Sequence, residues 1–361
     1  MITVTKTYLP DKAVYDAYLE RIWKKGWLTN NGQLFQELRG LLKQRFEVAN
    51  LQLTTNGTLP IQMAIKAFDL TGEVITTPFS YIATSAAIVW ENLKPVFVDI
   101  DAEYLTIDEQ AIEQAIGPET SAILATHVFG NPCHVEALEQ IANKHGLKVI
   151  YDAAHCFDVA YKGQSVFKYG DASTCSFHAT KLFHTAEGGA VFTEDGALYE
   201  RLSYLGNFGH RGNYDYQGLG INAKMSELQA AMGLSILPDM PKIKQGRKRA
   251  VDQYLKLLDF EPFRAMKLRG GTQWNYSYFP IIFDDESHLQ ACVTNLEAIG
   301  VFPRRYFYPS LNTIPYLKGG SMPVSEHIAS RILCLPLYHD ISEDEVSLIC
   351  DVINKVLIQN V

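Results

Sequence analysis

The stretch Ser176-Phe-His-Ala-Thr-Lys181 is followed after a short gap by Glu187-Gly-Gly-Ala-Val191, so a lysine stands just before a glycine turn that begins a strand. A lysine in this position has the reach and the amine needed to form an imine with an aldehyde cofactor. A solvated surface charge is the alternative, because most of the 32 Lys and Arg residues must lie in water. The apolar neighbours Leu182 and Phe183 favour the first interpretation.

The chain around this stretch alternates helical segments with short apolar runs, from about Leu59 to Val191. The apolar runs have the length and the β-branched or aromatic content of buried strands. Such alternation is typical of βαβ units on a mainly parallel sheet. The predicted strands are 74–77, 95–99, 122–126, 149–151, 175–177 and 189–192, and the predicted helices are 82–91, 107–116 and 135–145.

A second region begins after Pro238, where a basic helical stretch starts. Before it, apolar residues at helical spacing predict a helix over 225–236 that packs on the core or on a partner. Beyond it, elements predicted at 276–283, 287–299, 331–335 and 343–357 follow a strand-helix-strand-helix order. We therefore expect an α/β protein whose large domain, with an N-terminal segment, covers residues 1–240 and whose smaller α+β domain covers residues 241–361.

Length and composition describe a globular protein of enzyme size. The 361 residues are 47% hydrophobic and 20% charged, which excludes a disordered or fibrous chain. The net charge of −8 argues against nucleic-acid binding, which requires a basic face. No segment has the roughly 18 uncharged apolar residues of a membrane span, and the start lacks a secretory signal, so we expect a cytoplasmic protein. The six cysteines form no C-x-x-C pair and are expected to be free thiols, with no metal site.

A carboxylate follows one of the predicted strands. Asp152 ends the run Val149-Ile-Tyr-Asp152, where open parallel sheets place their ligands, and it precedes Lys181 in the chain. An acid that contacts the ring nitrogen of a pyridoxal cofactor keeps that nitrogen protonated, so the ring can accept electrons. Capping of a helix or pairing with an arginine is the alternative role.

The tripeptide Asn56-Gly-Thr58 opens a helical run and has the composition of a phosphate cradle. Glycine lets the backbone approach an anion, the threonine hydroxyl donates, and the unpaired N–H groups of the helix start attract negative charge. Pro60 fits the first helical turn. Thr58 could equally be a simple helix cap without any ligand.

Tyr81 follows a predicted strand directly, so its ring is expected on the ligand side of the sheet, where it could stack on a flat cofactor. A core position is the alternative.

Lys181 would also have to carry a proton between carbon atoms. Burial beside other positive groups would lower its pKa toward the range that this task requires.

A series of short motifs runs in a fixed order through nearly the whole chain. They are Gly26-Trp-Leu-Thr-Asn-Asn-Gly32, Asn56-Gly-Thr58, Tyr81-Ile-Ala-Thr84, Val98-Asp-Ile-Asp101, His127-Val-Phe-Gly-Asn-Pro132, Asp152-Ala-Ala-His155, Ser176-Phe-His-Ala-Thr-Lys181, Glu187-Gly-Gly189, Gly220-Ile-Asn-Ala-Lys-Met-Ser-Glu-Leu-Gln-Ala-Ala231 and Leu335-Pro-Leu-Tyr338. In these motifs the chain resembles the DegT-type sugar aminotransferases. These are pyridoxal-phosphate enzymes of fold type I that act on nucleotide-linked keto sugars.

The resemblance implies a role for each matching residue. Lys181 would be the imine lysine, Asp152 the partner of the pyridine nitrogen, and Tyr81 the ring-stacking residue. His155 stands where many members have glutamine, near the ring oxygen of the cofactor, and a neutral histidine could still donate a hydrogen bond there.

The phosphate of the cofactor would be held by two subunits. The resemblance assigns Gly57, Thr58 and Ser176 to the phosphate within one chain. Asn222 would reach the phosphate of the neighbouring subunit's cofactor, so the active sites would be shared across a homodimer.

The resemblance also points to a substrate site. Arg304-Arg-Tyr-Phe-Tyr-Pro309 resembles the place where relatives hold the nucleotide sugar, and Arg304 or Arg305 could meet its diphosphate. A structural role is the alternative for Arg305 and Tyr306. Trp27 and Thr29 are further candidates for the substrate pocket.

The reaction implied is transfer of an amino group from L-glutamate, which leaves as 2-oxoglutarate, to a nucleotide-linked keto-deoxysugar. A branch of the family replaces the imine lysine with histidine and performs dehydration, but Lys181 is retained here. The details resemble enzymes that aminate carbon 4 of a dTDP-4-keto-6-deoxyhexose, as in viosamine synthesis for surface polysaccharide. Amination at carbon 3, a pyridoxal-dependent dehydratase and a non-catalytic regulatory or sugar-binding protein are the alternatives.

Overall fold

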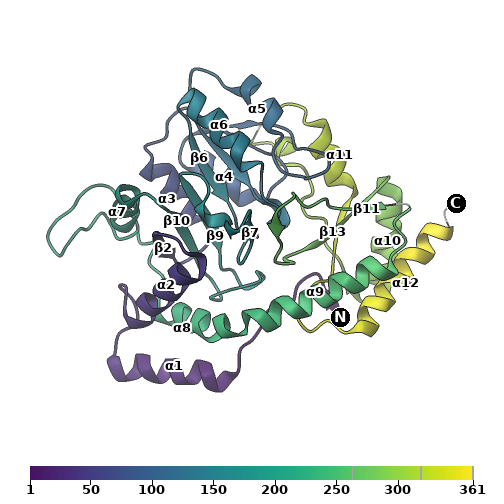
Figure 1. Ribbon diagram of the computed structural model, residues 1–361, viewed down its shortest axis with the longest axis horizontal. Coiled ribbons are helices and arrows are strands. Elements are labelled where there is room, and N and C mark those ends of the chain that lie inside the picture. Colours follow the sequence, from purple (N-terminus) through teal and green to yellow (C-terminus); the bar gives the residue numbers. More distant parts are fainter. Residues whose placement is uncertain (262, 318, 360–361) are drawn as a thin grey trace.

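The computed structural model describes residues 1–261, 263–317 and 319–359, without the side chains of 357–359. A seven-stranded sheet in the order β2-β10-β9-β6-β5-β3-β4 forms its centre (Figure 1). Only β10 runs antiparallel to its neighbours, β2 and β9, so the expected mainly parallel sheet is confirmed. The strands are β2 (Asn50–Thr54), β3 (Glu73–Thr76), β4 (Lys94–Phe97), β5 (Thr120–Thr126), β6 (Lys148–Asp152), β9 (Ala172–Ser176) and β10 (Gly189–Thr193).

Apolar side chains cover both faces of this sheet, because successive strand residues point to opposite sides. Val74 and Ile150 pack on one side with three helices, and their neighbours Ile75 and Tyr151 pack on the other. The helices on the first side are α3 (Leu59–Ala67), α4 (Ile82–Trp90) and α7 (Gly196–Leu205). Those on the second side are α2 (Gln33–Phe46), α5 (Glu109–Ala115), α6 (Val135–His145) and α8 (Glu227–Ile236). The helices predicted at 82–91, 107–116, 135–145 and 225–236 are thus confirmed within a few residues.

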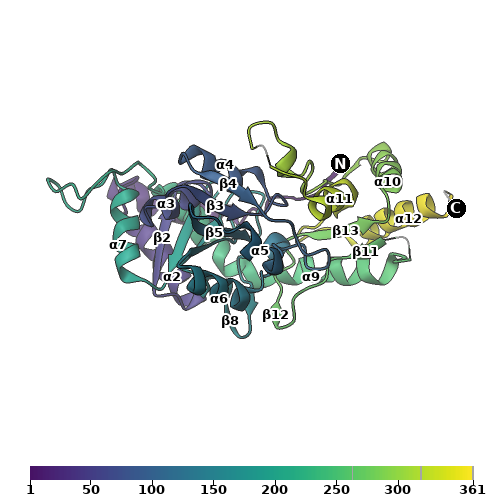
Figure 2. The ribbon, with the colours of Figure 1, turned by 90° about the horizontal axis from the view of Figure 1, so that it is seen from above.

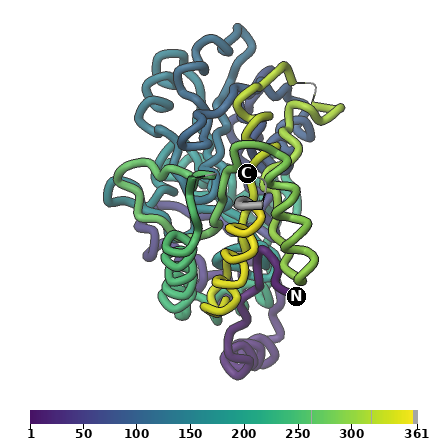
Figure 3. Tube along the Cα trace, turned by 90° about the vertical axis from the view of Figure 1, so that its right-hand side faces the viewer, coloured from purple at the N-terminus to yellow at the C-terminus, as the bar shows by residue number. Residues whose placement is uncertain are grey.

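The C-terminal part packs its helices on a small antiparallel sheet in the order β11-β13-β15. Helix α9 runs from the end of α8 toward it, and α12 lies beside α9 and α10 (Figures 1 and 3). Its elements are α9 (Met240–Leu257), β11 (Phe263–Ala265), β13 (Phe279–Phe283), α10 (Glu286–Ala298), β14 (Val301–Phe302), α11 (Pro323–Arg331), β15 (Ile332–Leu335) and α12 (Glu343–Gln359). The division of the chain into residues 1–240 and 241–361 stays a prediction.

Several short elements complete the fold. Strand β1 (Ile2–Thr3) pairs with β14, so the N-terminus lies against the C-terminal part, as Figures 1 and 3 also show. A three-stranded sheet joins β12 (Thr272–Gln273), β7 (Ala160–Tyr161) and β8 (Gln164–Ser165), and α1 (Lys12–Lys25) packs on α8. The segment between α7 and α8 extends away from the body of the molecule in two perpendicular views (Figures 1 and 2). None of the described helices is long and apolar enough to span a bilayer.

One predicted strand begins later than expected. The run 276–283 contains β13 only from Phe279 onward, because Tyr276 has a left-handed backbone with φ of 58°. The hydroxyl of Ser277 instead donates to the carbonyl oxygens of Phe129 and His155. This segment therefore joins the small sheet to the loops at the carboxyl ends of the central strands.

Candidate active site

A cavity of about 270 Å³ opens beside the carboxyl ends of β5, β6 and β9. Nine of the residues predicted for a cofactor or a substrate line it, although they come from distant parts of the chain. They are Gly57, Thr58, Tyr81, Asp152, His155, Ser176, Lys181, Arg304 and Tyr306. The edge where the parallel strands end is thus also the place where these groups meet, as expected for an open α/β sheet.

Asp152 ends β6 and is 6% exposed. Its Oδ1 accepts a hydrogen bond from the Ala154 N–H at 3.1 Å, and its Oδ2 accepts one from the Thr84 hydroxyl at 2.6 Å. Burial raises the pKa of this carboxyl group, and the two hydrogen bonds and the charge of Lys181 oppose the rise. No arginine pairs with Asp152 among the described residues, so the carboxylate is free to meet a cation in the cavity.

A chain of three buried hydroxyl groups leads to this carboxylate. The Thr126 hydroxyl donates to Ser80 Oγ at 3.1 Å, and Ser80 Oγ lies 2.6 Å from Thr84 Oγ1. Because the Thr84 proton goes to Asp152, Thr84 can only accept from Ser80. The sequence analysis missed this chain, although Thr84 ends the motif that begins at Tyr81.

Lys181 lies in the loop between β9 and β10, with its Nζ 5.8 Å from the centroid of the Tyr278 ring. Within the described part of the chain its amine makes no hydrogen bond or ion pair. Burial lowers its pKa, while the negative charge of Asp152 acts in the opposite direction. The prediction that neighbouring cations lower the pKa of Lys181 is therefore wrong, because the lowering comes from burial. A lysine held in this way can switch between its charged and neutral forms more readily than a surface lysine.

The predicted phosphate cradle is a close approach of two loops. A Cβ on Gly57 would lie 2.5 Å from both Cβ and Oγ of Ser176, so only glycine leaves room here. The hydroxyl of Thr58 does not cap α3, since Asn56 Oδ1 accepts from the N–H groups of Thr58 and Leu59 at 2.9 and 3.0 Å. Asn56 thus accepts hydrogen bonds from two of the N–H groups at the helix start that the sequence predicts to attract an anion. Thr58 and Ser176 both line the cavity.

His155 is buried, and its Nδ1 accepts a hydrogen bond from the Phe129 N–H at 3.0 Å. Its ring stacks with those of Phe129 and Phe307, nearly parallel at centroid distances of 6.0 and 5.9 Å. Burial holds its pKa well below the usual value. The imidazole is therefore neutral with its proton on Nε2, and it can donate one hydrogen bond into the cavity.

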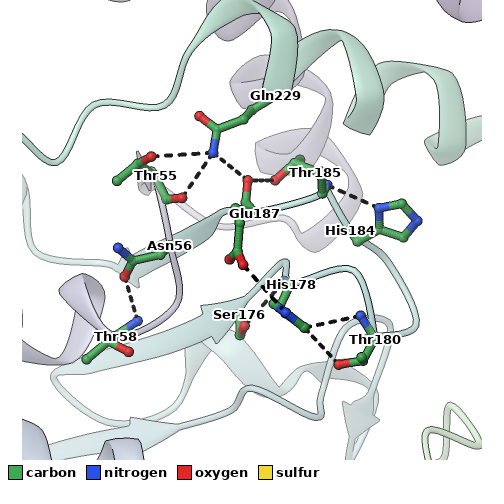
Figure 4. Close-up of polar contacts among 11 residues, drawn as sticks. Thr55, Asn56, Thr58, Ser176, His178, Thr180, His184, Thr185, Glu187 and Gln229 are labelled. Carbon is green, nitrogen blue, oxygen red and sulfur yellow. Dashed lines mark hydrogen bonds and ion pairs between the residues drawn. The ribbon is translucent and has the colours of Figure 1, made fainter. Parts of the chain in front are cut away.

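Polar contacts tie the lysine loop to its surroundings (Figure 4). His178 Nδ1 accepts from the Thr180 N–H at 3.2 Å, and His178 Nε2 lies 3.5 Å from the Glu187 carboxylate. The side-chain amide of Gln229 donates to the Glu187 carbonyl oxygen at 2.6 Å and to the Thr55 carbonyl oxygen at 3.0 Å. The sequence analysis assigned no role to any of these side chains.

Two neighbouring arginines differ in their surroundings. The Arg305 guanidinium donates to the Glu286 carboxylate at 2.7 Å and to the Ser330 carbonyl oxygen at 2.8 Å, and it does not line the cavity. The Arg304 side chain lies 5.0 Å from the Tyr306 ring centroid, lines the cavity, and makes no ion pair among the described residues. Arg304 is therefore the arginine that remains available to an anion.

The other three candidates lie outside this cavity in the single chain. Trp27 lines a second cavity of about 290 Å³ next to α1 and α2, and Thr29 is exposed. Asn222 is exposed at the base of the extended segment, where it pairs with Asn207. Their predicted contacts with substrate or with a neighbouring subunit stay predictions.

Comparison with known proteins gives a consistent result. The model of the DegT/DnrJ/EryC1/StrS aminotransferase family matches residues 11–354. The dTDP-4-amino-4,6-dideoxy-D-glucose transaminase of Escherichia coli is 41% identical over 96% of both chains, and that of Shigella dysenteriae is 41% identical over 98% of this chain and 99% of the relative. The crystal structure of DesI with its TDP-sugar product is 33% identical with a TM-score of 0.93, covering 98% of this chain and 92% of DesI.

Proposed function

Because this chain belongs to the DegT/DnrJ/EryC1/StrS aminotransferase family, we propose that it transfers an amino group from L-glutamate to carbon 4 of a dTDP-linked 4-keto-6-deoxyglucose. The chain is a sugar aminotransferase that depends on pyridoxal phosphate. The nucleotide, the carbon atom and the sugar in this proposal rest on the names of the two relatives that share 41% of their residues with it.

The residues of the cavity fit the cofactor. When bound, pyridoxal phosphate supplies an aldehyde that bonds to amines and a ring that accepts electrons. Lys181 would hold the aldehyde, and Asp152 would contact the ring nitrogen. Gly57, Thr58 and Ser176 would hold the phosphate. The single observation that carries this assignment is that the half-buried amine of Lys181 and the buried carboxylate of Asp152 share one cavity, and that neither forms an ion pair with any described residue.

The side chains would divide the chemistry between them. Lys181, whose pKa is lowered by burial, would take and return the proton that moves between carbon atoms. Asp152 would stay ionised beside a protonated ring nitrogen, since opposite charges stabilise each other. His155 would donate its Nε2 proton to the ring oxygen. Tyr81, which is 55% exposed on the cavity wall, would cover one face of the ring.

The substrates carry negative charge, and the cavity offers a cation for it. Arg304 would bind the diphosphate of the nucleotide sugar, because its guanidinium has no carboxylate partner among the residues that the structure describes. Tyr306, whose ring lies beside it, would line the sugar site. L-glutamate would use the same cavity in the first half-reaction and leave as 2-oxoglutarate.

The proposal includes a homodimer. Exposed apolar side chains on the extended segment support it, among them Phe208, Tyr214 and Leu219, which are 50%, 97% and 75% exposed. Asn222 lies at the base of this segment and would reach the neighbouring subunit's cofactor. The cytoplasmic location expected from the sequence belongs to the same proposal.

The test begins with purified protein loaded with pyridoxal phosphate. Glutamate should change the absorption spectrum of the bound cofactor and release 2-oxoglutarate. A panel of dTDP-, GDP- and UDP-linked keto sugars then follows, with NMR to locate the new amine. An amine at carbon 3 would contradict the assigned position. A product without nitrogen would indicate a dehydratase, and a spectrum that glutamate leaves unchanged would indicate a binding or regulatory protein.

A further inference from the structure

Strands β2 and β10 separate at the active site. Their ladder ends at the pair Thr54 and Gly189. Beyond it, one strand continues into the loop of Gly57 and Thr58, and the other comes from the loop of Lys181. The carbonyl groups of Thr55 and Glu187 stand just past the last pair, where strand pairing no longer supplies donors.

The amide of Gln229 fills this position (Figure 4). Its Nε2 donates to the Glu187 carbonyl oxygen at 2.6 Å and to the Thr55 carbonyl oxygen at 3.0 Å. Its Oε1 accepts from the N–H and the hydroxyl of Ser226 at 2.8 and 3.0 Å, in the capping box of α8. Because carbonyl oxygens only accept, these contacts fix the amide in one orientation. The side chain therefore links α8 to both loops.

The backbone around this link is closely packed. A Cβ on Gly189 would lie 2.4 Å from the Asn56 carbonyl oxygen, and a Cβ on Gly57 would lie 2.5 Å from Ser176. The Thr185 hydroxyl adds a second hydrogen bond to the Glu187 carbonyl oxygen, at 2.7 Å. A change in the spacing of the two loops must therefore change the spacing of Gly57 and Ser176.

We propose that Gln229 is a positioning residue for the cofactor phosphate, whose amide sets the distance between the two loops that form the phosphate cradle. The inference rests on the proposed cofactor site and goes beyond it, since Gln229 is not among the residues that line the cavity. Its side chain replaces the next pair of the β2–β10 ladder. The cradle can then stay open at the point where a continued ladder would close it.

The discriminating variant is Gln229→Glu. It has nearly the same shape, and one carboxylate oxygen can still accept from Ser226. The other oxygen would face two carbonyl oxygens without a proton to donate, so it would push the loops apart. We expect the affinity for pyridoxal phosphate to fall about tenfold or more. The affinity for pyridoxal, which lacks the phosphate, should change by less than about threefold. Both are measured by fluorescence titration of the cofactor-free protein.

Ser226→Ala is the matched control, because it removes the hydroxyl of the capping box and leaves the two carbonyl contacts of Gln229 in place. It should lower the melting temperature and leave both affinities unchanged. If Gln229→Glu does not fold, Gln229→Ala takes its place in the same titrations, with inorganic phosphate as a third probe.

The inference is overturned if a folded Gln229 variant binds pyridoxal phosphate as wild type does. It is equally overturned if the affinities for both probes fall by the same factor. Failure of the wild-type protein to bind pyridoxal phosphate would instead contradict the proposed function.

Discussion

The hydroxyl of Thr84 donates to Oδ2 of Asp152 across 2.6 Å, in a place where both side chains are buried. Thr84 belongs to the first turns of α4, and Asp152 ends β6, so this one contact joins a helix to the centre of the sheet. Burial raises the pKa of the carboxyl group, and the hydrogen bond lowers it. Thr84 therefore helps to keep Asp152 in the ionised form that a protonated ring nitrogen requires.

Thr84→Val should weaken catalysis without unfolding the protein. Valine keeps the shape but removes the donor, and a hydrogen bond to a charged group contributes roughly 1.5 to 3 kcal/mol. We expect kcat/KM to fall about tenfold or more. Thr84→Ser should restore most of it, because the hydroxyl returns. A valine variant with unchanged kcat/KM would contradict the role given to this hydroxyl.

The same variant should move the acidic limb of the pH profile. Activity requires the ionised Asp152, and loss of the Thr84 donor raises the pKa of this carboxyl group further. As the pH is lowered, activity should therefore disappear at a higher pH in Thr84→Val than in wild type. Lys181 and the thiols of Cys156 and Cys175 also interact electrostatically with Asp152. Burial raises the pKa of both thiols, so they stay uncharged across this range.

Asp152→Asn should separate catalysis from stability. We expect turnover to fall by about 100-fold or more, because the ring nitrogen loses its ionised partner. In the cofactor-free protein we expect the opposite effect on the free energy of unfolding, which the substitution should not lower. The folded-state pKa of Asp152 is raised, so the folded chain binds this proton more tightly than the unfolded chain does. The ionised carboxylate therefore lowers the free energy of unfolding at pH values above its folded-state pKa. Below its unfolded-state pKa the carboxyl group is protonated in both states and has no such effect.

Thermal unfolding of the cofactor-free proteins checks this. At neutral pH the asparagine variant should melt at or above the temperature of wild type, and the difference should vanish in acid. A variant that melts lower than wild type at neutral pH would indicate that the carboxylate stabilises the fold instead.

Much of the large sheet was predictable because its parallel strands are continuous apolar runs, buried on both faces. Strand β2 was not, since Asn50, Gln52 and Thr54 alternate with leucines. Gln52 is nevertheless buried, and its Nε2 donates to the Leu53 carbonyl oxygen. A polar side chain that finds a local partner in the interior leaves no apolar signal in the sequence.

The candidate site shows a similar division. Lys181 and Asp152 could be proposed because each follows or precedes a strand in a motif. Thr84 and Gln229 could not, because their partners lie 68 and 42 residues away in the chain. Only the folded structure brings a hydroxyl or an amide to such a partner. It also separates Arg304 from Arg305, which the sequence leaves equivalent.

Lys181→Ala should abolish covalent attachment of the cofactor. Borohydride reduction followed by mass spectrometry of the peptides should find the cofactor on Lys181 in wild type and on no lysine in the variant. Activity should fall by about 10³-fold or more, because the proton carrier is also lost. Trapping of cofactor in the variant at the wild-type yield would refute the assignment.

Arg304→Ala and Arg305→Ala form a matched pair. Loss of Arg304, which forms no ion pair with the part of the chain that the structure describes, should raise KM for the nucleotide sugar about tenfold or more and leave KM for glutamate less affected. Loss of Arg305, which donates to Glu286 and to the Ser330 carbonyl oxygen, should lower the free energy of unfolding by about 1.5 to 3 kcal/mol and change neither KM by more than about twofold. Initial rates against each substrate measure the difference, and the reverse pattern would move the diphosphate site to Arg305.

Gly57→Ala should fill the phosphate cradle. The new Cβ would lie 2.5 Å from Cβ and Oγ of Ser176, and Gly57 is not among the glycines with positive φ, so the effect is steric and not conformational. We expect the affinity for pyridoxal phosphate to fall about tenfold or more, since over-packing by one methyl group displaces its neighbours. The double variant Gly57→Ala with Ser176→Gly removes the two closest contacts and leaves only the Cα of residue 176, at 2.9 Å. It should therefore recover part of the affinity, although it lacks the Ser176 hydroxyl. Equal affinities of the single variant and wild type would show that these two residues do not enclose the phosphate.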